Sequence, residues 1–179
     1  PSSAAKKILS PSFASQRKGL IPGQHQLLNA ALVTAMAKHL GLPDQTIAAG
    51  ISRARLPCRF EIMQKNPLVV LDGAHNEAKI KSTAASLGKL KFRKLLLIFG
   101  IAHDKKIKAI IPRLIPCADQ VFFTGFSIPM QGRKCRPPEE LARLSGKYKK
   151  RGAKIEIFSN PQQALKKALA LAAPDDCIL

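Results

Sequence analysis

The sequence predicts an α/β fold built on a mostly parallel sheet. From residue 59 onward, short runs of apolar and β-branched residues alternate with amphipathic stretches of helical spacing. Such alternation is typical of parallel strands joined by right-handed helical crossovers. A second sign is the turn 72–76, where an apolar run gives way to a helical pattern. With 179 residues, 46% of them hydrophobic, the chain is large enough to bury a core.

The predicted strands of the alternating region are short and apolar. They cover residues 59–63, 68–71, 95–99, 120–124 and 155–158. The helices between and after them are expected over residues 77–90, 105–115, 138–147 and 161–173. Asn160 followed by Pro161 supports the start of the final helix, because Asn is a favoured N-cap and Pro a favoured first helical residue.

The earlier part of the chain predicts helices and no strands. Apolar residues recur at helical spacing over residues 25–40, and Gly41 with Pro43 ends that pattern. A second, short helix is expected over residues 44–50, with Asp44 as its N-cap.

A domain boundary is expected close to residue 57. Residues 1–23 carry little regular pattern, and the basic segment 53–57 is interpreted as a linker. We therefore expect residues 1–56 to be the end of one domain and residues 57–179 to form a second one. The first residue is not Met, and residues 175–179 stop where a further strand begins. We expect the chain to be a fragment of a longer protein.

The charge of the chain is strongly positive. Thirty Lys and Arg stand against eleven Asp and Glu, which gives a formal net charge of +19. Such a balance favours polyanionic partners, among them nucleotides, acidic small molecules and nucleic acid. The alternative is a solvated surface, since lysines near helix C-termini are stabilised by the helix macrodipole without any ligand.

Hydropathy and cysteine spacing exclude several classes. The longest apolar run, residues 95–102, is far shorter than the roughly 20 residues of a membrane-spanning helix, so no membrane partner is expected. The four cysteines are scattered and lack the spacing of a disulfide framework or a zinc site. We expect reduced thiols in a cytoplasmic protein and no protein-built metal site.

The turn 72–76 holds the best candidates for chemistry, because ligands of parallel sheets bind at the carboxyl ends of strands. Asp72 could accept hydrogen bonds from a ribose, orient an ammonium group or help to hold Mg²⁺; alternatively, it only fixes the turn. His75, just ahead of a helix, could bind a phosphate or carboxylate. Asn76 is assigned to structure as an N-cap, and Gly73 to a sharp turn or a close approach to a ligand.

Two further residues gain weight beside this turn. Arg59 could form forked hydrogen bonds with a phosphate or carboxylate, and a surface ion pair with Glu61 is an equal alternative. The segment 24–29 places amides, Asn29 among them, on the first turns of a helix, where solvated polar residues are the simpler interpretation. Neither GxxxxGK[ST] nor GxGxxG occurs, so the chain has no phosphate-binding loop of its own and no dinucleotide site is expected.

Several short motifs together carry a resemblance to a known family. They lie at residues 23–30, 59–61, 71–76, 98–100, 104–105, 123–124 and 138–141. In this order and at roughly this spacing, they resemble the C-terminal part of folylpolyglutamate synthase/dihydrofolate synthase, a branch of the Mur ligase family. Each motif is short, but the ordered set is specific.

The resemblance implies a Rossmann-like C-terminal domain with flanking helices, preceded by a helical tail of the central domain. It also implies ATP-dependent joining of L-glutamate to dihydropteroate or folate through an acyl phosphate, with ATP and Mg²⁺ as cofactors. In this family the P-loop belongs to the preceding central domain, so this chain alone should be inactive. The folate would be bound mainly by the missing domain, and a monomer is expected.

The resemblance also assigns roles to residues. Asn29 would contact the adenine and Arg59 the phosphates, while Asp72 and His75 would face the nucleotide and the incoming glutamate as catalytic residues. The chain departs from the family pattern at four places: Cys58 for Gly, Glu77 for Pro, Lys106 for an acid, and Pro129-Met130 for Pro-Arg, with Arg133 nearby.

Two alternatives remain open. The first is a peptidoglycan-type Mur ligase, which the His-Asn ending of the turn disfavours. The second is a basic α/β module that binds nucleic acid. Eight Phe and one Tyr leave few side chains for base stacking, so nucleic acid is not expected as a partner.

Overall fold

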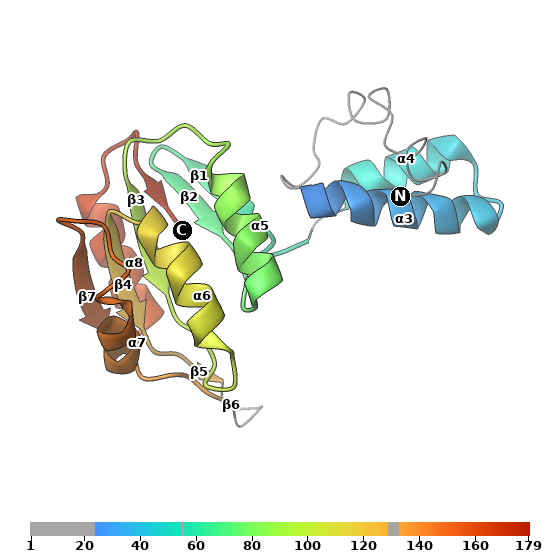
Figure 1. Ribbon diagram of the computed structural model, residues 1–179. Helices are drawn as coiled ribbons and strands as arrows, with labels where there is room; N and C mark the ends of the chain where they lie inside the picture. Colours follow the sequence, from blue (N-terminus) through green and yellow to red (C-terminus); the bar gives the residue numbers. More distant parts are fainter. Residues whose placement is uncertain (1–23, 55, 129–132) are drawn as a thin grey trace. The chain divides into compact units, whose positions relative to one another are not determined.

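The computed structural model describes residues 24–54, 56–128 and 133–179. The chain divides into two compact units, with the division after Pro57. Figure 1 shows both units. The expectations for residues 1–23 and for Pro129-Met130 lie outside the described residues.

A six-stranded sheet forms the centre of the second unit (Figure 1). Its strands lie in the order β1-β2-β8-β3-β4-β7, and all pairs are parallel except β1 with β2. The strands are β1 Glu61–Lys65, β2 Leu68–Leu71, β3 Leu95–Phe99, β4 Gln120–Thr124, β7 Lys154–Phe158 and β8 Cys177–Ile178. A separate antiparallel pair consists of β5 Ser127–Ile128 and β6 Arg133–Lys134. The mostly parallel α/β fold is thereby confirmed.

Helices connect the strands and cover the sheet. They are α5 Glu77–Leu87, α6 Ile107–Leu114 with the 3₁₀ turn Ile115–Cys117, α7 Pro138–Ser145 and α8 Pro161–Leu171. Helices α5 and α6 lie side by side on one face of the sheet, and α8 lies on the other (Figure 1). Ala164 and Ala168 of α8 are fully buried in a cluster with Leu96 and Phe122, since these small side chains let the helix approach the strands closely.

The central strand β8 comes from the far end of the chain. The Cys177 N–H donates to the Lys94 carbonyl at 2.8 Å, and the Leu179 N–H donates to the Leu96 carbonyl at 3.0 Å.

Burial raises the pKa of the Cys177 thiol to about 11. All four cysteines are free thiols.

The predicted strands 68–71, 95–99 and 120–124 are confirmed, while the first strand begins two residues late, at Glu61. The reason is that Cys58 and Phe60 adopt left-handed backbone conformations, with φ of 54° and 53°, which interrupt an extended chain. The predicted cap of the last helix is also confirmed: the Gln163 N–H donates to Asn160 Oδ1 at 2.9 Å.

The first unit contains two described helices, α3 Gln24–His39 and α4 Asp44–Arg53, which pack on each other. The prediction of Asp44 as N-cap is wrong: Pro43 holds that position without a side-chain hydrogen bond, and Asp44 is the first helical residue. Within the described part of the chain, no helix has the length and apolar character that crossing a membrane requires.

Gly100, which follows β3, has the least space for a side chain among the described glycines. A Cβ at this position would lie 2.7 Å from the Thr124 carbonyl oxygen, which is backbone and cannot move away cheaply. We predict that Gly100→Ala lowers the free energy of unfolding by about 1–3 kcal/mol, because overpacking forces the two strand ends apart. The matched control is Gly88→Ala, whose new Cβ would meet its nearest atom at 3.7 Å. Urea unfolding of the 179-residue chain measures both, and equal midpoints for the two variants would contradict the prediction.

Candidate functional site

The turn 72–76 lies at the carboxyl end of β2, immediately before α5. Asp72 is held there at both carboxylate oxygens. Its Oδ1 accepts the Ala74 N–H at 3.0 Å, and its Oδ2 accepts the Thr83 hydroxyl at 2.6 Å. The bond from Ala74 fixes the turn, which is the alternative role expected for Asp72 from the sequence. The bond from Thr83 comes from a residue of α5 that is only 3% exposed. The carboxylate is therefore held in one orientation by two elements.

His75 is exposed and makes one contact on each ring nitrogen. Its Nδ1 lies 2.7 Å from the Gly73 carbonyl oxygen, and its Nε2 lies 3.4 Å from the Lys79 ammonium nitrogen. Because a carbonyl oxygen can only accept, this arrangement places the ring hydrogen on Nδ1 and leaves a lone pair on Nε2. The turn thus presents an imidazole acceptor beside the Lys79 ammonium, and the ammonium is the group suited to an anionic ligand.

Asn76 is the N-cap of α5, as predicted. Its Oδ1 accepts the Lys79 N–H at 3.0 Å. The first N–H groups of α5 are oriented toward the same edge of the sheet, and the helix macrodipole makes that end favourable for negative charge. Glu77, which stands where the family has Pro, forms an ion pair with Arg113 and so is not placed against the turn.

Arg59 lies beside this turn because Gly73 has no side chain. The Gly73 N–H donates to the Cys58 carbonyl at 2.8 Å, and a Cβ on Gly73 would come within 3.3 Å of Arg59 Nη1. The alternative ion pair between Arg59 and Glu61 is wrong, since the Glu61 carboxylate accepts the Cys58 N–H at 2.9 Å instead. Among the described residues, the half-buried Arg59 guanidinium has no acidic partner.

Cys58 is one of the departures from the family pattern, and the backbone keeps its path at this residue. The resemblance implies Gly at this position, and Cys58 adopts φ of 54°, a conformation that glycine reaches without strain. The same backbone path is kept with cysteine at a cost of roughly 1–2 kcal/mol. The substitution therefore leaves the approach of Arg59 to Gly73 intact.

The neighbouring strand end is organised by Arg136. Its guanidinium donates to the His103 carbonyl at 2.6 Å and to Glu140 at 2.8 Å, which ties the loop after β3 to the first turn of α7. In the same loop Lys105 pairs with Asp104 at 2.7 Å. The side chain of Arg133 lies outside the described residues.

The sequence predictions missed two positioning residues, Thr83 and Arg136. A signal for Thr83 was available, since it lies two helical turns after the N-cap Asn76 and so on the same helix face. Arg136 and Glu140 share the i,i+4 spacing of a helical ion pair. Neither signal identifies the loop carbonyl or the carboxylate that these side chains bind.

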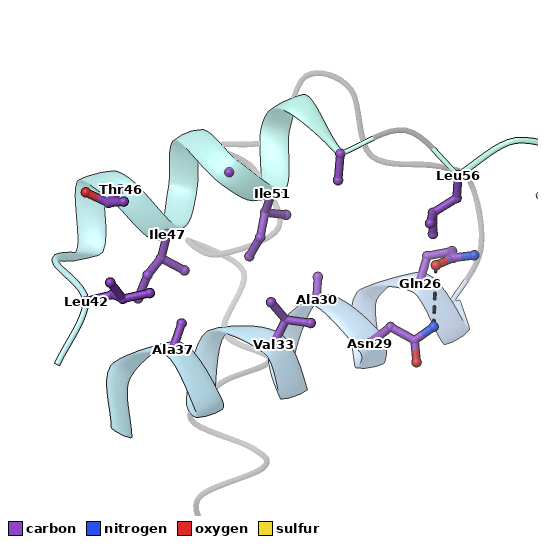
Figure 2. Close-up of a pocket in the computed structure, with 12 residues that line it drawn as sticks. Gln26, Asn29, Ala30, Val33, Ala37, Leu42, Thr46, Ile47, Ile51 and Leu56 are labelled. Atoms are coloured by element: carbon purple, nitrogen blue, oxygen red, sulfur yellow. Dashed lines mark hydrogen bonds between the residues drawn. The ribbon is translucent and has the colours of Figure 1, made fainter. Parts of the chain in front are cut away.

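Asn29 belongs to the first unit and lines a cavity of about 480 Å³ between α3 and α4. Figure 2 shows Val33, Ile47 and Ile51 pointing into it, with Asn29 and Gln26 at one end. Asn29 Nδ2 lies 3.5 Å from Gln26 Oε1. The solvated interpretation is wrong for Gln26, which is only 6% exposed, and holds for Asn29, which is exposed. The structure brings Arg59, Asp72 and His75 together; Asn29 is described only within its own unit.

Comparison with known proteins identifies the family of this site. Residues 58–179 match the family model described as "Mur ligase, glutamate ligase domain". The chain belongs to the Mur ligase family. The match contains the whole second unit, and with it Arg59, Asp72 and His75.

Curated relatives of this Mur ligase chain include folate-type enzymes. It is 32% identical over 163 residues to a probable bifunctional folylpolyglutamate synthase/dihydropteroate synthase of Halobacterium salinarum, with 88% of this chain and 18% of that protein covered. It is 33% identical over 115 residues to the dihydrofolate synthase/folylpolyglutamate synthase of Bacillus subtilis, with 60% of this chain and 26% of that protein covered. The chain thus spans about a quarter or less of each of these relatives.

A solved structure of a folate-type enzyme has the same fold as this chain. E. coli FolC in complex with ADP superposes with a TM-score of 0.74 and 28% identity, and covers 90% of this chain and 36% of that one. The matching part is the C-terminal domain of that protein. The predicted family is therefore confirmed.

The hydrogen bond between Thr83 and Asp72 can be tested on the chain itself. We predict that Thr83→Val lowers the free energy of unfolding by about 1.5–3 kcal/mol, because a partly buried carboxylate loses a donor. Thr83→Ser keeps the hydroxyl and should cost less. As a control, Thr124→Val removes a hydroxyl that donates to a neutral carbonyl at 2.9 Å, and should cost about 1 kcal/mol. Chemical denaturation compares the three variants; a Thr83→Ser as unstable as Thr83→Val would contradict the role of the hydroxyl.

Proposed function

We propose that this Mur ligase chain is the C-terminal part of an ATP-dependent ligase that joins L-glutamate to dihydropteroate or folate. Residues 57–179 would be its glutamate-ligase domain, and residues 1–56 the end of its central ATPase domain. The whole protein would be a cytoplasmic monomer.

One observation carries the proposal: Arg59, without an acidic partner among the described residues, lies against the turn that holds Asp72 and His75. A forked cation, an oriented carboxylate and a helix N-terminus at one strand end form a set suited to phosphate and to an amino acid. The relatives from H. salinarum and B. subtilis carry the name folylpolyglutamate synthase, and the E. coli FolC structure is a complex with ADP.

The proposed reaction has two steps. The carboxylate of the folate-type substrate attacks the γ-phosphorus of ATP, which gives an acyl phosphate and ADP. The amino group of glutamate then attacks the acyl carbon, and inorganic phosphate leaves with the former carboxylate oxygen. Charge accumulates on the phosphate oxygens in both steps, so positioned cations supply most of the catalysis.

The residues of the turn suit distinct roles in this scheme. Arg59 would contact the phosphates through its guanidinium. Asp72, whose two oxygens are fixed by Ala74 and Thr83, would accept a hydrogen bond from the glutamate ammonium or from a ribose hydroxyl. His75 would turn its Nε2 lone pair from Lys79 toward the incoming glutamate ammonium. Asn29 would contact the adenine from the cavity of the first unit.

Mg²⁺ would neutralise charge between the phosphates of bound ATP. Among the described residues no group of three or more His, Cys, Asp or Glu could hold a metal ion. Magnesium in phosphoryl-transfer sites commonly relies on one or two carboxylates together with substrate phosphates. Asp72 fits the role of a single carboxylate ligand, so the ion would arrive with the nucleotide.

The proposal is tested in the full-length protein that contains this chain. We predict glutamate-dependent ADP release with dihydropteroate or folate as acceptor, and a loss of about 10²-fold in kcat for Arg59→Lys, because lysine cannot form the forked contact. Asp72→Asn and His75→Ala should lower the rate as well. Arg143→Lys, an exposed change on α7, is the matched control and should leave the rate unchanged.

Three results would contradict the proposal or a part of it. Absence of ADP release with either acceptor would remove the folate assignment, and release with a UDP-muramoyl peptide would place the protein in the peptidoglycan branch. Equal rates for Arg59→Lys and the control would remove the phosphate role of Arg59.

The 179-residue chain alone should be inactive. It contains no GxxxxGK[ST] loop to bind the β- and γ-phosphates. We expect no ADP release above background from the purified chain with ATP, glutamate and folate, measured beside the full-length protein. Turnover by the chain would show that it holds a complete ATP site and would overturn the proposed division of labour between domains.

A further inference from the structure

A second charged surface lies at the edge of the sheet opposite to the turn 72–76. At the amino-terminal ends of β3, β4 and β7 a cavity of about 440 Å³ opens, which we call the basic groove. Its wall consists of residues from 93–96, 119–120 and 150–154, together with Leu171 and Asp176. Five cations line it: Arg93, Lys94, Lys150, Arg151 and Lys154.

Two of these cations are neutralised within the fold. Arg93 donates to Asp176 at 3.0 Å and to Asp175 at 3.3 Å, and Lys150 donates to Asp119 at 3.0 Å. Asp119 and Asp176 are the acids that line the groove. These ion pairs hold the floor of the groove in place, since Asp176 is only 2% exposed and Asp119 also accepts the backbone N–H of Leu95.

The other three cations, Lys94, Arg151 and Lys154, have no ion-pair partner among the residues that the structure describes. All three are exposed. Five cations line the groove, and three acids pair with two of them (Asp175 and Asp176 with Arg93, Asp119 with Lys150), so the net charge around this concave surface is +2. Like charges that share a cavity repel each other, so this arrangement is expected to favour a polyanionic ligand.

The helix macrodipole does not account for these three residues. Its effect falls off within the last turn of a helix. Lys94 directly precedes β3, while Arg151 and Lys154 follow the end of α7 at Ser145 by several residues and flank the turn at Gly152. Their convergence on the groove is a product of the sheet, which places the starts of β3 and β7 at one edge.

The lining of the groove restricts the kind of polyanion. It contains no aromatic residue, and its exposed apolar side chain is Leu171 at the rim. A protein partner usually inserts aromatic or apolar anchors, and a membrane-binding surface presents such residues for insertion. Repeated phosphates need only spaced cations.

We propose that the basic groove binds the phosphate backbone of nucleic acid, without reading the bases. The small number of aromatic residues disfavours base stacking, but phosphate contacts need no aromatic side chain. This binding is independent of the ligase function, because the groove shares no residue with the turn 72–76.

The test uses the 179-residue chain and fluorescence anisotropy with a labelled 20-base-pair duplex and a 20-nucleotide single strand. For three neutralised phosphates, counterion release predicts a slope of about −2.7 for log affinity against log salt on the duplex, or roughly 40-fold weaker binding between 50 and 200 mM. The duplex should bind at least as tightly as the single strand, because no stacking is available.

The variant K94E/R151E/K154E should weaken duplex binding at least tenfold at 50 mM salt. The matched control K81E/K106E/K108E makes the same charge change on exposed residues of α5 and at the start of α6, outside the groove, and should weaken it less than threefold. Circular dichroism checks folding, and K94Q/R151Q/K154Q replaces the first variant if that fails to fold.

Four results would overturn the proposal. They are no binding at 50 mM salt, equal losses in groove and control variants, a strong preference for the single strand, and competition by poly-L-glutamate as effective as that by unlabelled duplex. Groove-dependent binding to phosphatidylserine vesicles without duplex binding would equally reject nucleic acid as the ligand.

Discussion

The pairing of β8 between β2 and β3 is the interaction that joins the candidate site to the rest of its domain. Within the sheet, β2 has only β1 and β8 as neighbours, so the turn after β2 is attached to the central strands through β8. The Leu68 N–H donates to the Asp176 carbonyl at 2.9 Å, and the Ile98 N–H donates to the Leu179 carbonyl at 2.7 Å. Backbone groups of a buried strand must find partners, which makes this two-residue strand a strict constraint on both sides.

The hydrogen bonds that hold the turn also orient its candidate site residue Asp72. Asp72 closes the turn through Ala74 and anchors α5 through Thr83, and these bonds orient the carboxylate that a ligand would meet. Gly73 also has two roles. Its N–H donates to the Cys58 carbonyl, and the absence of a side chain leaves room for the Arg59 guanidinium. A site held by such contacts is formed before any ligand binds, which reduces the entropy that binding must overcome.

Much of the fold could be predicted from the sequence, because strand periodicity and helix capping depend on residues that are close along the chain. Strands 68–71, 95–99 and 120–124 and the caps Asn76 and Asn160 are of this kind. Boundaries were less accurate where one residue changes the backbone path. The first strand begins two residues later than predicted, because Cys58 and Phe60 adopt left-handed conformations that the apolar pattern of residues 59–63 does not indicate.

What the sequence determined by itself was the α/β class, the family resemblance and the candidates Asp72, His75 and Arg59, since each rests on local pattern or on an ordered set of motifs. Only the tertiary structure decided how these side chains are engaged: that Glu61 accepts the Cys58 N–H and leaves Arg59 without an acidic partner in the described chain, and that a helix hydroxyl holds Asp72. It also gathered basic residues of two segments, 93–94 and 150–154, into one groove. These contacts join residues that chain order keeps apart, and the parallel sheet brings them together by placing all strand starts at one edge and all strand ends at the other.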